Sequence, residues 1–307
     1  MGGRLAHETV GGLFVALAAL LFGGTVIFGK TLANRDFPVT SMLAIRFGAA
    51  ALLLGLTLAL IRRSLRPALG EGRRLLALGA IGYAAESTLF FLGLKNGSVA
   101  AVTLLFFTYP VWVALLSAIL GMGVPGALLT GSLLAAVVGA GFVVGGGGGL
   151  AISTAGVAFA LGSAFTFSLY LIGADVALQS TSSLAASMWV SGSASLMLAV
   201  LAVAAPGGRL PAGGAEWGAV LGMGAFTAGA FTSLFVGLRR LGAVRTSIVA
   251  AMEPVAASVL AFVILGEAMG AGTVVGGLLI LAGAVAATLA RESRPRPEEA
   301  GAEPIGP

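Results

Sequence analysis

The sequence contains no cysteine and only one histidine, His7, close to its start. Disulfide frameworks, thiolate or histidine-ligated metal sites and histidine-based catalysis are therefore excluded, and we expect neither a metal nor a cofactor. Charged residues are also scarce, at 9% of the chain against 58% hydrophobic residues. That is too little polar surface to cover a water-soluble globule of 307 residues. The composition predicts a polytopic membrane protein that lies in a lipid bilayer.

The few charges are mostly basic, with 17 Lys and Arg against 12 Asp and Glu. They stand in short clusters between apolar runs and form no continuous patch or tail, which argues against binding to nucleic acid. Such clusters are typical of loops that set the orientation of a membrane protein. With the amino terminus inside, twelve basic residues fall on the inner side and four on the outer side. We therefore predict two cytoplasmic termini in a bacterial-type inner membrane.

The apolar runs are long enough to cross a bilayer, which takes roughly 20 helical residues. They predict an all-α membrane protein with ten transmembrane helices, at 10–30, 38–61, 74–94, 97–120, 125–145, 152–174, 182–204, 215–237, 242–265 and 270–290. No cleavage-like site follows a short hydrophobic region near the start, so we expect no removable signal peptide. Residues 291–307 are polar and rich in Pro and Glu, which predicts a disordered cytoplasmic tail.

A carboxylate followed directly by a proline interrupts one apolar run, at Glu253 and Pro254. An ionisable side chain in hydrocarbon is costly and a proline frees a backbone carbonyl, so this position should face a cavity rather than lipid. Tyr109 and Pro110 stand 144 residues earlier, and the same offset relates Gly139 to Gly283. We interpret Pro110 and Pro254 as equivalent helix breaks in two copies of one plan.

Each copy contains five predicted helices, which is an odd number. The second copy must then enter the membrane from the opposite side, as in the inverted repeats of secondary transporters. We assign residues 1–145 to the first repeat and 152–290 to the second. Residues 146–151, which include four of the five consecutive glycines at 145–149, form a predicted Gly-rich linker between them.

Each half resembles the EamA-type domain of the drug/metabolite transporter superfamily, over residues 10 to 290. The resemblance is carried by Gly12 to Gly24, by Ile45-Arg46-Phe47-Gly48-Ala49-Ala50, and in the second half by Glu253-Pro254, Leu265-Gly266-Glu267 and the run from Gly276 to Gly283. It implies a transporter rather than an enzyme, and the branch that exports amino acids, aromatic ones included, is the most similar. The first half departs from the pattern, with Tyr109 opposite Glu253 and Gly123 opposite Glu267.

Three charged residues stand well inside predicted spans, away from the span ends. Arg46 suits structural pairing with an acid of another helix better than direct contact with substrate. Glu86 shares a helical face with Tyr83 and Phe90, which points to a cavity wall. Glu253 either lines the cavity, where it could carry protons, or pairs with a cation and holds two helices together.

Aromatic side chains inside the spans complete the candidate substrate cavity. A phenol away from the membrane interface needs a hydrogen-bond partner, which favours the tyrosines over purely apolar packing residues. The predicted cavity residues are Tyr83, Glu86, Phe90, Tyr109, Trp112, Phe167, Tyr170, Phe231 and Glu253. No catalytic or metal-ligating residues are predicted.

The leading hypothesis is a secondary transporter that exports small organic metabolites, most of all amino acids including aromatic ones, by alternating access. Helices one, three, four, six, eight and nine should line its cavity, and helices five and ten should lie outside it. Export of lipophilic cationic drugs, with Glu86 or Glu253 neutralising the charge, and a passive channel for small solutes are the alternatives. An intramembrane enzyme is disfavoured because no clustered nucleophile, base or metal set is present. The sequence leaves the substrate, proton coupling and the oligomeric state open.

Overall fold

The computed structural model describes residues 2–33, 35, 37–96, 102, 105–145, 152–178, 180–204, 207–253, 255–256, 259–260, 263 and 270–289. Every secondary-structure element within these residues is a helix. The predicted linker at 146–151, the predicted tail at 291–307 and Pro254 lie outside the described residues.

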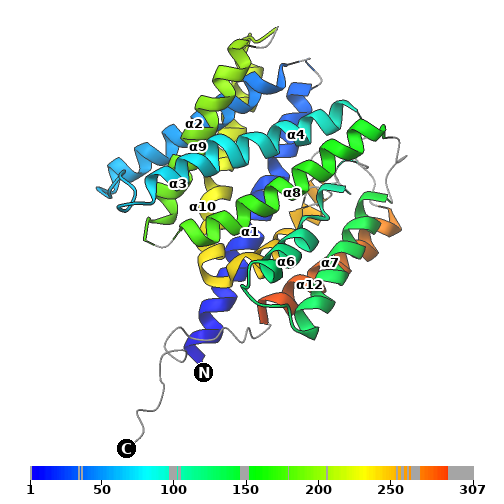
Figure 1. Cartoon of the computed structure of the whole chain (residues 1–307). Helices are drawn as coiled ribbons and strands as arrows, with labels where there is room; N and C mark the ends of the chain where they lie inside the picture. The colour runs from blue at the N-terminus through cyan, green and yellow to red at the C-terminus, as the bar shows by residue number, and fades with distance from the viewer. Residues whose placement is uncertain are drawn as a thin grey trace, which may run out of the picture.

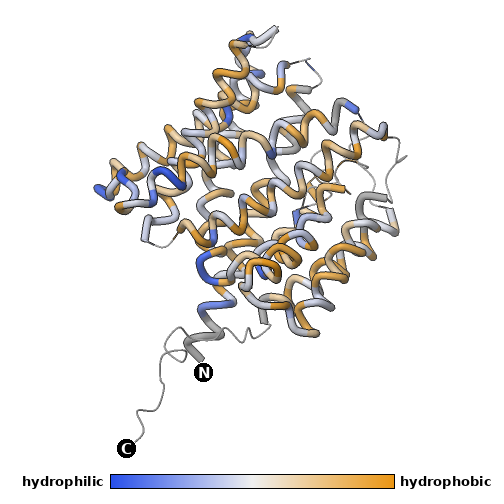
Figure 2. Tube along the Cα trace, in the orientation of Figure 1, coloured by the Kyte–Doolittle hydropathy of each residue, from blue (hydrophilic) through white to orange (hydrophobic). Residues whose placement is uncertain are grey.

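Helices follow the apolar runs because backbone in hydrocarbon must satisfy its own hydrogen bonds. In chain order they are α1 (Gly2–Ala33), α2 (Val39–Leu60), α3 (Gly72–Ala77), the π-helical turn η1 (Leu78–Tyr83), α4 (Ala84–Lys95), α6 (Tyr109–Ile119), α7 (Ala127–Gly145), α8 (Thr154–Ala177), α9 (Ser183–Ala204), α10 (Gly214–Ala250) and α12 (Ala271–Leu289). Six helical segments are apolar and long enough to cross a membrane, and three shorter apolar helices accompany them among the described residues. The chain is a multi-pass membrane protein, as the predominantly apolar colouring of Figure 2 illustrates.

Three predicted spans differ from the structure. The span predicted at 97–120 is described as a continuous helix only from Tyr109, after a turn at residues 107–108. The spans predicted at 215–237 and 242–265 join in α10, which bends at Gly242, where φ is 76° and only glycine avoids strain. Because α3, η1 and α4 are continuous, the described residues form nine helical stretches. The full set of ten helices stays a prediction.

The helices pair across the molecule in a pattern that repeats itself (Figure 1). α2 packs against α9 and α7 packs against α12, and each of these pairs joins the equivalent helices of the two halves. α1 packs against α10, and the equivalent pair, α8 against α4, is also formed. The helix packing is therefore symmetric between the halves.

Local backbone structure repeats at the predicted offset as well. The turn at residues 107–108 recurs at residues 251–252. Thr108 N donates to Leu105 O at 3.2 Å, and Met252 N donates to Val249 O at 3.1 Å, which is the same bond 144 residues later. Both helices thus break at the same place, directly before Tyr109 in the first half and Glu253 in the second.

The contact between α7 and α12 depends on two equivalent glycines. A β-carbon at Gly139 would lie 2.6 Å from the Gly276 carbonyl oxygen, and one at Gly283 would lie 2.8 Å from the Ser132 carbonyl oxygen. Ser132 and Gly276 are themselves 144 residues apart. The two helices therefore approach closely at two places, and the repeat relates one of these contacts to the other.

Equivalent helices run in opposite directions. The beginning of α1 lies at Arg240, whose Cβ is 2.8 Å from where a β-carbon of Gly11 would be. The end of α8 lies near this same face, because the Asp175 carboxylate accepts a hydrogen bond from Ala243 N at 3.4 Å. α8 therefore begins on the opposite face, where Ser153 N donates to Asn96 O at 2.9 Å. Figure 1 shows α1 and α8 traversing the molecule in opposite senses.

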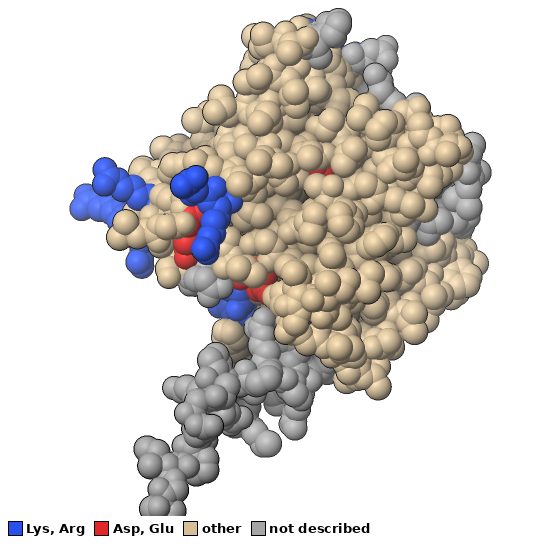
Figure 3. All heavy atoms as spheres, in the orientation of Figure 1, with Lys and Arg blue, Asp and Glu red and all other residues tan. Residues whose placement is uncertain are grey.

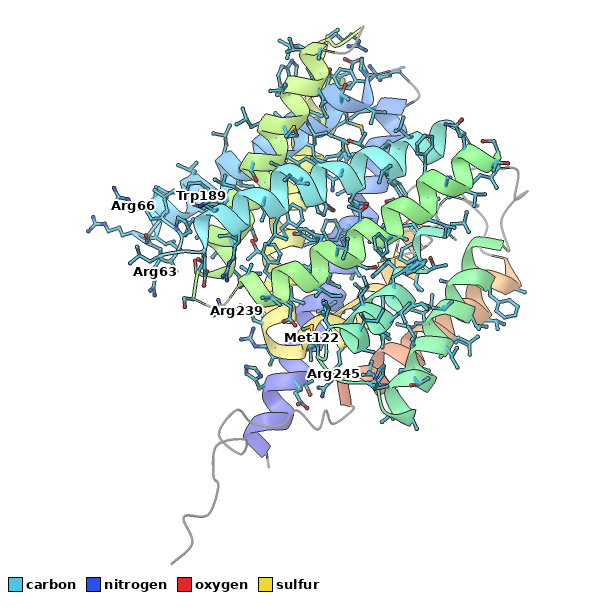
Figure 4. The ribbon with its side chains drawn as sticks, in the orientation of Figure 1. Arg63, Arg66, Met122, Trp189, Arg239 and Arg245 are labelled. Atoms are coloured by element: carbon cyan, nitrogen blue, oxygen red, sulfur yellow. The ribbon has the colours of Figure 1, made fainter. Side chains whose placement is uncertain are left out.

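Most of the described basic side chains gather at the face where α1 begins. Figure 3 shows them at one end of an otherwise largely uncharged surface. In Figure 4, Arg63 and Arg66 extend away from the body beside Trp189, whose Nε1 donates to Leu65 O at 2.8 Å. This asymmetry agrees with the charge distribution from which we predict a cytoplasmic face.

Candidate functional site

Arg46 is a buried arginine of α2, with 7% of its surface exposed. Its Nε donates a 2.6 Å hydrogen bond to the Thr227 hydroxyl on α10, and that hydroxyl donates to the Met223 carbonyl at 2.7 Å. The guanidinium carbon also lies 5.0 Å from the centre of the Phe47 ring. Among the described residues, no hydrogen bond is made by its two η nitrogens. Arg46 is therefore held in place by a threonine, and it retains donors for an anionic group.

Glu86 is a buried carboxylate in the first turn of α4, directly after η1, and only 6% of its surface is exposed. The Ser87 hydroxyl donates to its Oε2 at 3.0 Å, and the Ser163 hydroxyl of α8 lies 3.2 Å from its Oε1. A π-helical turn widens a helix locally and is frequent at functional sites. The two hydroxyls fix the carboxylate between α4 and α8 without neutralising its charge.

The third charged residue, Glu253, follows the break at residues 251–252 and is half-buried. The Arg46 guanidinium interacts electrostatically with both Glu86 and Glu253, so the three charges converge from both halves of the chain. Within the described residues, no three potential metal ligands come together. Two carboxylates and one guanidinium suit the charges of an organic solute.

An aromatic cluster surrounds these charges, made of Phe47, Tyr83, Phe90, Phe106, Tyr109, Phe167, Tyr170, Phe231 and Phe235. The Tyr83 ring is its hub, with ring centres 4.7 Å from Phe231, 5.1 Å from Tyr170 and 5.3 Å from Phe47. Phe106 connects Phe90, at 5.2 Å, to the rest of the cluster. The packed rings fill the centre between the helices.

Tyr109 joins the two halves at the helix break. Its hydroxyl donates to the Ser247 carbonyl of α10 at 3.2 Å. Its own carbonyl oxygen accepts a hydrogen bond from the Ser168 hydroxyl of α8 at 3.0 Å. These bonds fix α6 against α8 and α10, and Pro110 lies buried in the first turn of α6, where a proline costs no helical hydrogen bond.

The structure brings together most of the residues predicted for the cavity. Tyr83, Phe90, Tyr109, Phe167, Tyr170 and Phe231 all belong to the aromatic cluster, and Glu86 and Glu253 lie beside it. Trp112 does not join them, because its ring packs edge-on against Phe165, 5.5 Å away on the half-exposed side of α8. The predicted partner of the Pro110 break, Pro254, is outside the described residues.

Sequence reasoning missed the polar residues that hold the charges. Thr227 and Ser163 are fully buried and make the bonds to Arg46 and Glu86. Ser163 shares a helical face with Phe167 and Tyr170, and this spacing could have identified it. The bond between Arg46 and Thr227 joins residues 181 positions apart, and no local pattern indicates it.

Ion pairs fasten the helices at both faces. At the face where α1 begins, Arg245 Nη1 lies 3.4 Å from Glu8 Oε1, and both side chains are buried. At the opposite face, Arg209 Nη1 lies 2.8 Å from Glu216 Oε2, and Arg209 is partly exposed. The three central charged residues and the aromatic cluster thus lie between two faces that ion pairs stabilise.

A shallow groove of about 690 Å³ lies outside this region, on α7 and α12. Its walls are entirely aliphatic, formed by Leu128, Leu278, Leu281, Ala282, Val285 and Ala286. Such a lining on the outer surface of a membrane bundle fits lipid chains. The described residues of the groove offer no polar side chain to orient a solute, so the candidate site is the buried centre.

Comparison with known proteins gives two positive findings. The profile of the EamA-like transporter family matches residues 9–145 and again residues 154–289. A solved structure described only as the crystal structure of a protein is 20% identical and superposes with a TM-score of 0.79, over 92% of this chain and 97% of that one. At that identity the likeness concerns the fold alone. No curated protein matches the sequence.

Proposed function

Because the chain belongs to the EamA-like transporter family, whose members move small solutes across membranes, we propose that it exports amino acids, aromatic ones included. The observation that carries this proposal is the presence of two opposite buried charges, Arg46 and Glu86, which interact electrostatically beside an aromatic cluster. Buried charges inside a membrane are costly, so they are kept where function requires them. A zwitterion with an apolar side chain matches such a site.

In the proposed complex, the η nitrogens of Arg46 bind the solute carboxylate, because a guanidinium offers two parallel donors to that group. Glu86 accepts hydrogen bonds from the solute ammonium group. The side chain of the solute lies among the rings of the aromatic cluster, where aromatic contacts add to the burial of apolar surface. Access requires the packed rings to separate, which motion of one half against the other would provide.

We further propose alternating access between two inverted five-helix halves, residues 1–145 and 152–290, with both termini in the cytoplasm. The repeated breaks before Tyr109 and Glu253 and the antiparallel course of α1 and α8 support this architecture. The excess of basic residues at the face where α1 begins supports the orientation. Rocking of the halves would expose the central charges to each side in turn.

Counterflow in proteoliposomes tests the proposal. Vesicles loaded with unlabelled phenylalanine should take up labelled phenylalanine transiently and saturably. Phenethylamine, which lacks the carboxylate, and phenylpropionate, which lacks the amine, should compete at least about tenfold more weakly, since each leaves one buried charge unpaired. Uptake that never saturates would indicate a channel, and equal competition by the three compounds would contradict the zwitterion site.

Export of lipophilic cations is the second candidate. One observation favours it: two carboxylates, Glu86 and Glu253, converge with a single arginine, so an added positive charge would balance the site. A cationic dye that exchanges in the same vesicles while amino acids do not would establish this alternative.

A further inference from the structure

The chain contains three tyrosines, and all of them belong to the aromatic cluster. Tyr109 and Tyr170 are equally buried, with 2% and 1% of their surfaces exposed. The Tyr109 hydroxyl donates to the Ser247 carbonyl, whereas the Tyr170 hydroxyl has no hydrogen-bond partner among the described residues. The two phenols therefore differ in hydrogen bonding and not in burial.

A phenol at position 170 is not needed for packing. The ring stacks on Phe167 at 5.8 Å and meets Phe235 at 6.4 Å, contacts that a phenylalanine would make equally well. An unsatisfied hydroxyl carries the full penalty of losing its water. Retaining it in the centre of the protein indicates a partner that is present only part of the time.

The position of Tyr170 identifies that partner as the bound solute. Tyr170 lies on the α8 face that also carries Ser163 and Phe167, and Ser163 holds the Glu86 carboxylate. Its ring is 5.1 Å from that of Tyr83, the hub of the aromatic cluster. A solute whose ammonium group binds Glu86 would therefore extend its side chain along this face toward the Tyr170 hydroxyl.

We propose that the Tyr170 hydroxyl is a specificity-determining contact, which donates a hydrogen bond to an acceptor oxygen at the end of the solute side chain. This inference rests on the proposed amino-acid transport. The Tyr170 hydroxyl selects neutral amino acids with a phenol or carboxamide over those with a purely apolar side chain. A buried donor left unpaired by the wrong solute is a strong source of discrimination.

The test compares Tyr170→Phe with Tyr109→Phe, the matched substitution at the bonded phenol. Each protein is assayed for its thermal unfolding midpoint in detergent and for counterflow of tyrosine and of phenylalanine. Tyr170→Phe should unfold at the wild-type temperature or higher, and its preference for tyrosine over phenylalanine should fall about tenfold through loss of tyrosine exchange alone. Tyr109→Phe should lower the midpoint, because it loses the hydrogen bond to the Ser247 carbonyl.

The outcomes separate the two proposals. If the wild-type protein exchanges both amino acids and Tyr170→Phe keeps the tyrosine preference, or if the wild type has no such preference, the assignment of Tyr170 is overturned and the proposed function stands. A midpoint lowered as much as in Tyr109→Phe would also overturn it, because the hydroxyl would then have a structural partner. If the wild type exchanges neither amino acid, both proposals fall.

Discussion

The two halves of the molecule share a backbone plan and differ in their buried polar residues. Gly139 and Gly283 make the same close contact, and the helix breaks at residues 107–108 and 251–252 form the same hydrogen bond. The charges have no such symmetry: the position equivalent to Arg46 is Val190, and the position equivalent to Glu86 is Ala230. A duplicated scaffold thus carries a single charged site, which both halves enclose.

The ion pairs at the two faces of the molecule also depart from the symmetry of the repeat. Glu8 and Arg245 form a buried ion pair at the face where α1 begins. The equivalent positions in the other half are occupied by Ile152 and Ala101, which cannot form an ion pair. The opposite face has an ion pair of its own, between Arg209 and Glu216, so the two faces carry ion pairs that the repeat does not relate.

The largest expected effect is on stability, from breaking the ion pair between Glu8 and Arg245. Glu8→Gln or Arg245→Met should each lower the free energy of unfolding by about 3 kcal/mol, because each breaks the buried ion pair between them. The double variant should lose less than the sum of the two single changes. Denaturant unfolding in detergent measures all three proteins, with Ile152→Val as the control at the opposite face. Additive losses would show that the two residues act independently.

The close contact between α7 and α12 should be sensitive to substitution of either glycine. Gly139→Ala and Gly283→Ala each place a methyl group within contact distance of a backbone oxygen, and each should cost about 1 to 3 kcal/mol of stability. Gly131→Ala on α7 is the control, because nothing lies within 4 Å of its β-carbon position. A loss at only one of positions 139 and 283 would break the proposed symmetry of the scaffold.

The sequence predicted an all-helical membrane protein with two EamA-type repeats, because hydropathy and the order of prolines and glycines reflect constraints that act along the chain. It also identified Arg46, Glu86 and Glu253 as exceptions within apolar runs. Thr227 could not be predicted as the partner of Arg46, because two helices distant in sequence create that contact. The helices predicted at 215–237 and 242–265 follow one another directly across a kink at Gly242, since a glycine with positive φ can redirect the backbone without a long loop.

A smaller effect, on the affinity for amino acids, is expected from substitution of Thr227, which accepts the hydrogen bond of Arg46 Nε. Thr227→Val removes the acceptor of the Arg46 Nε bond, so the affinity for amino acids should fall about tenfold. Thr232→Val is the matched control, because the Thr232 hydroxyl also donates to the carbonyl four residues earlier and is not bonded to Arg46. Competition in counterflow measures both affinities. Equal losses in the two variants would mean that Thr227 acts through α10 rather than through Arg46.

The smallest effect should appear at Glu253, which lies beside the site. Its electrostatic neighbours are Arg46, Glu86, Tyr83 and Tyr109. Glu253→Gln keeps the size of the side chain and removes its titration, so counterflow without a gradient should change by less than about twofold. Where an imposed pH gradient stimulates transport by the wild type, Glu253→Gln should remove that stimulation. Unchanged stimulation would assign Glu253 a structural role.

The central claim, that a symmetric scaffold encloses one charged solute site, is tested most directly by counterflow with Glu86→Gln beside Ala230→Ser, its equivalent in the second half. Glu86→Gln retains the shape that packs against Ser87 and Ser163 and removes the charge. We expect its phenylalanine counterflow to fall at least about tenfold with an unchanged unfolding midpoint, and Ala230→Ser to transport as the wild type does. Wild-type counterflow by Glu86→Gln would contradict the claim.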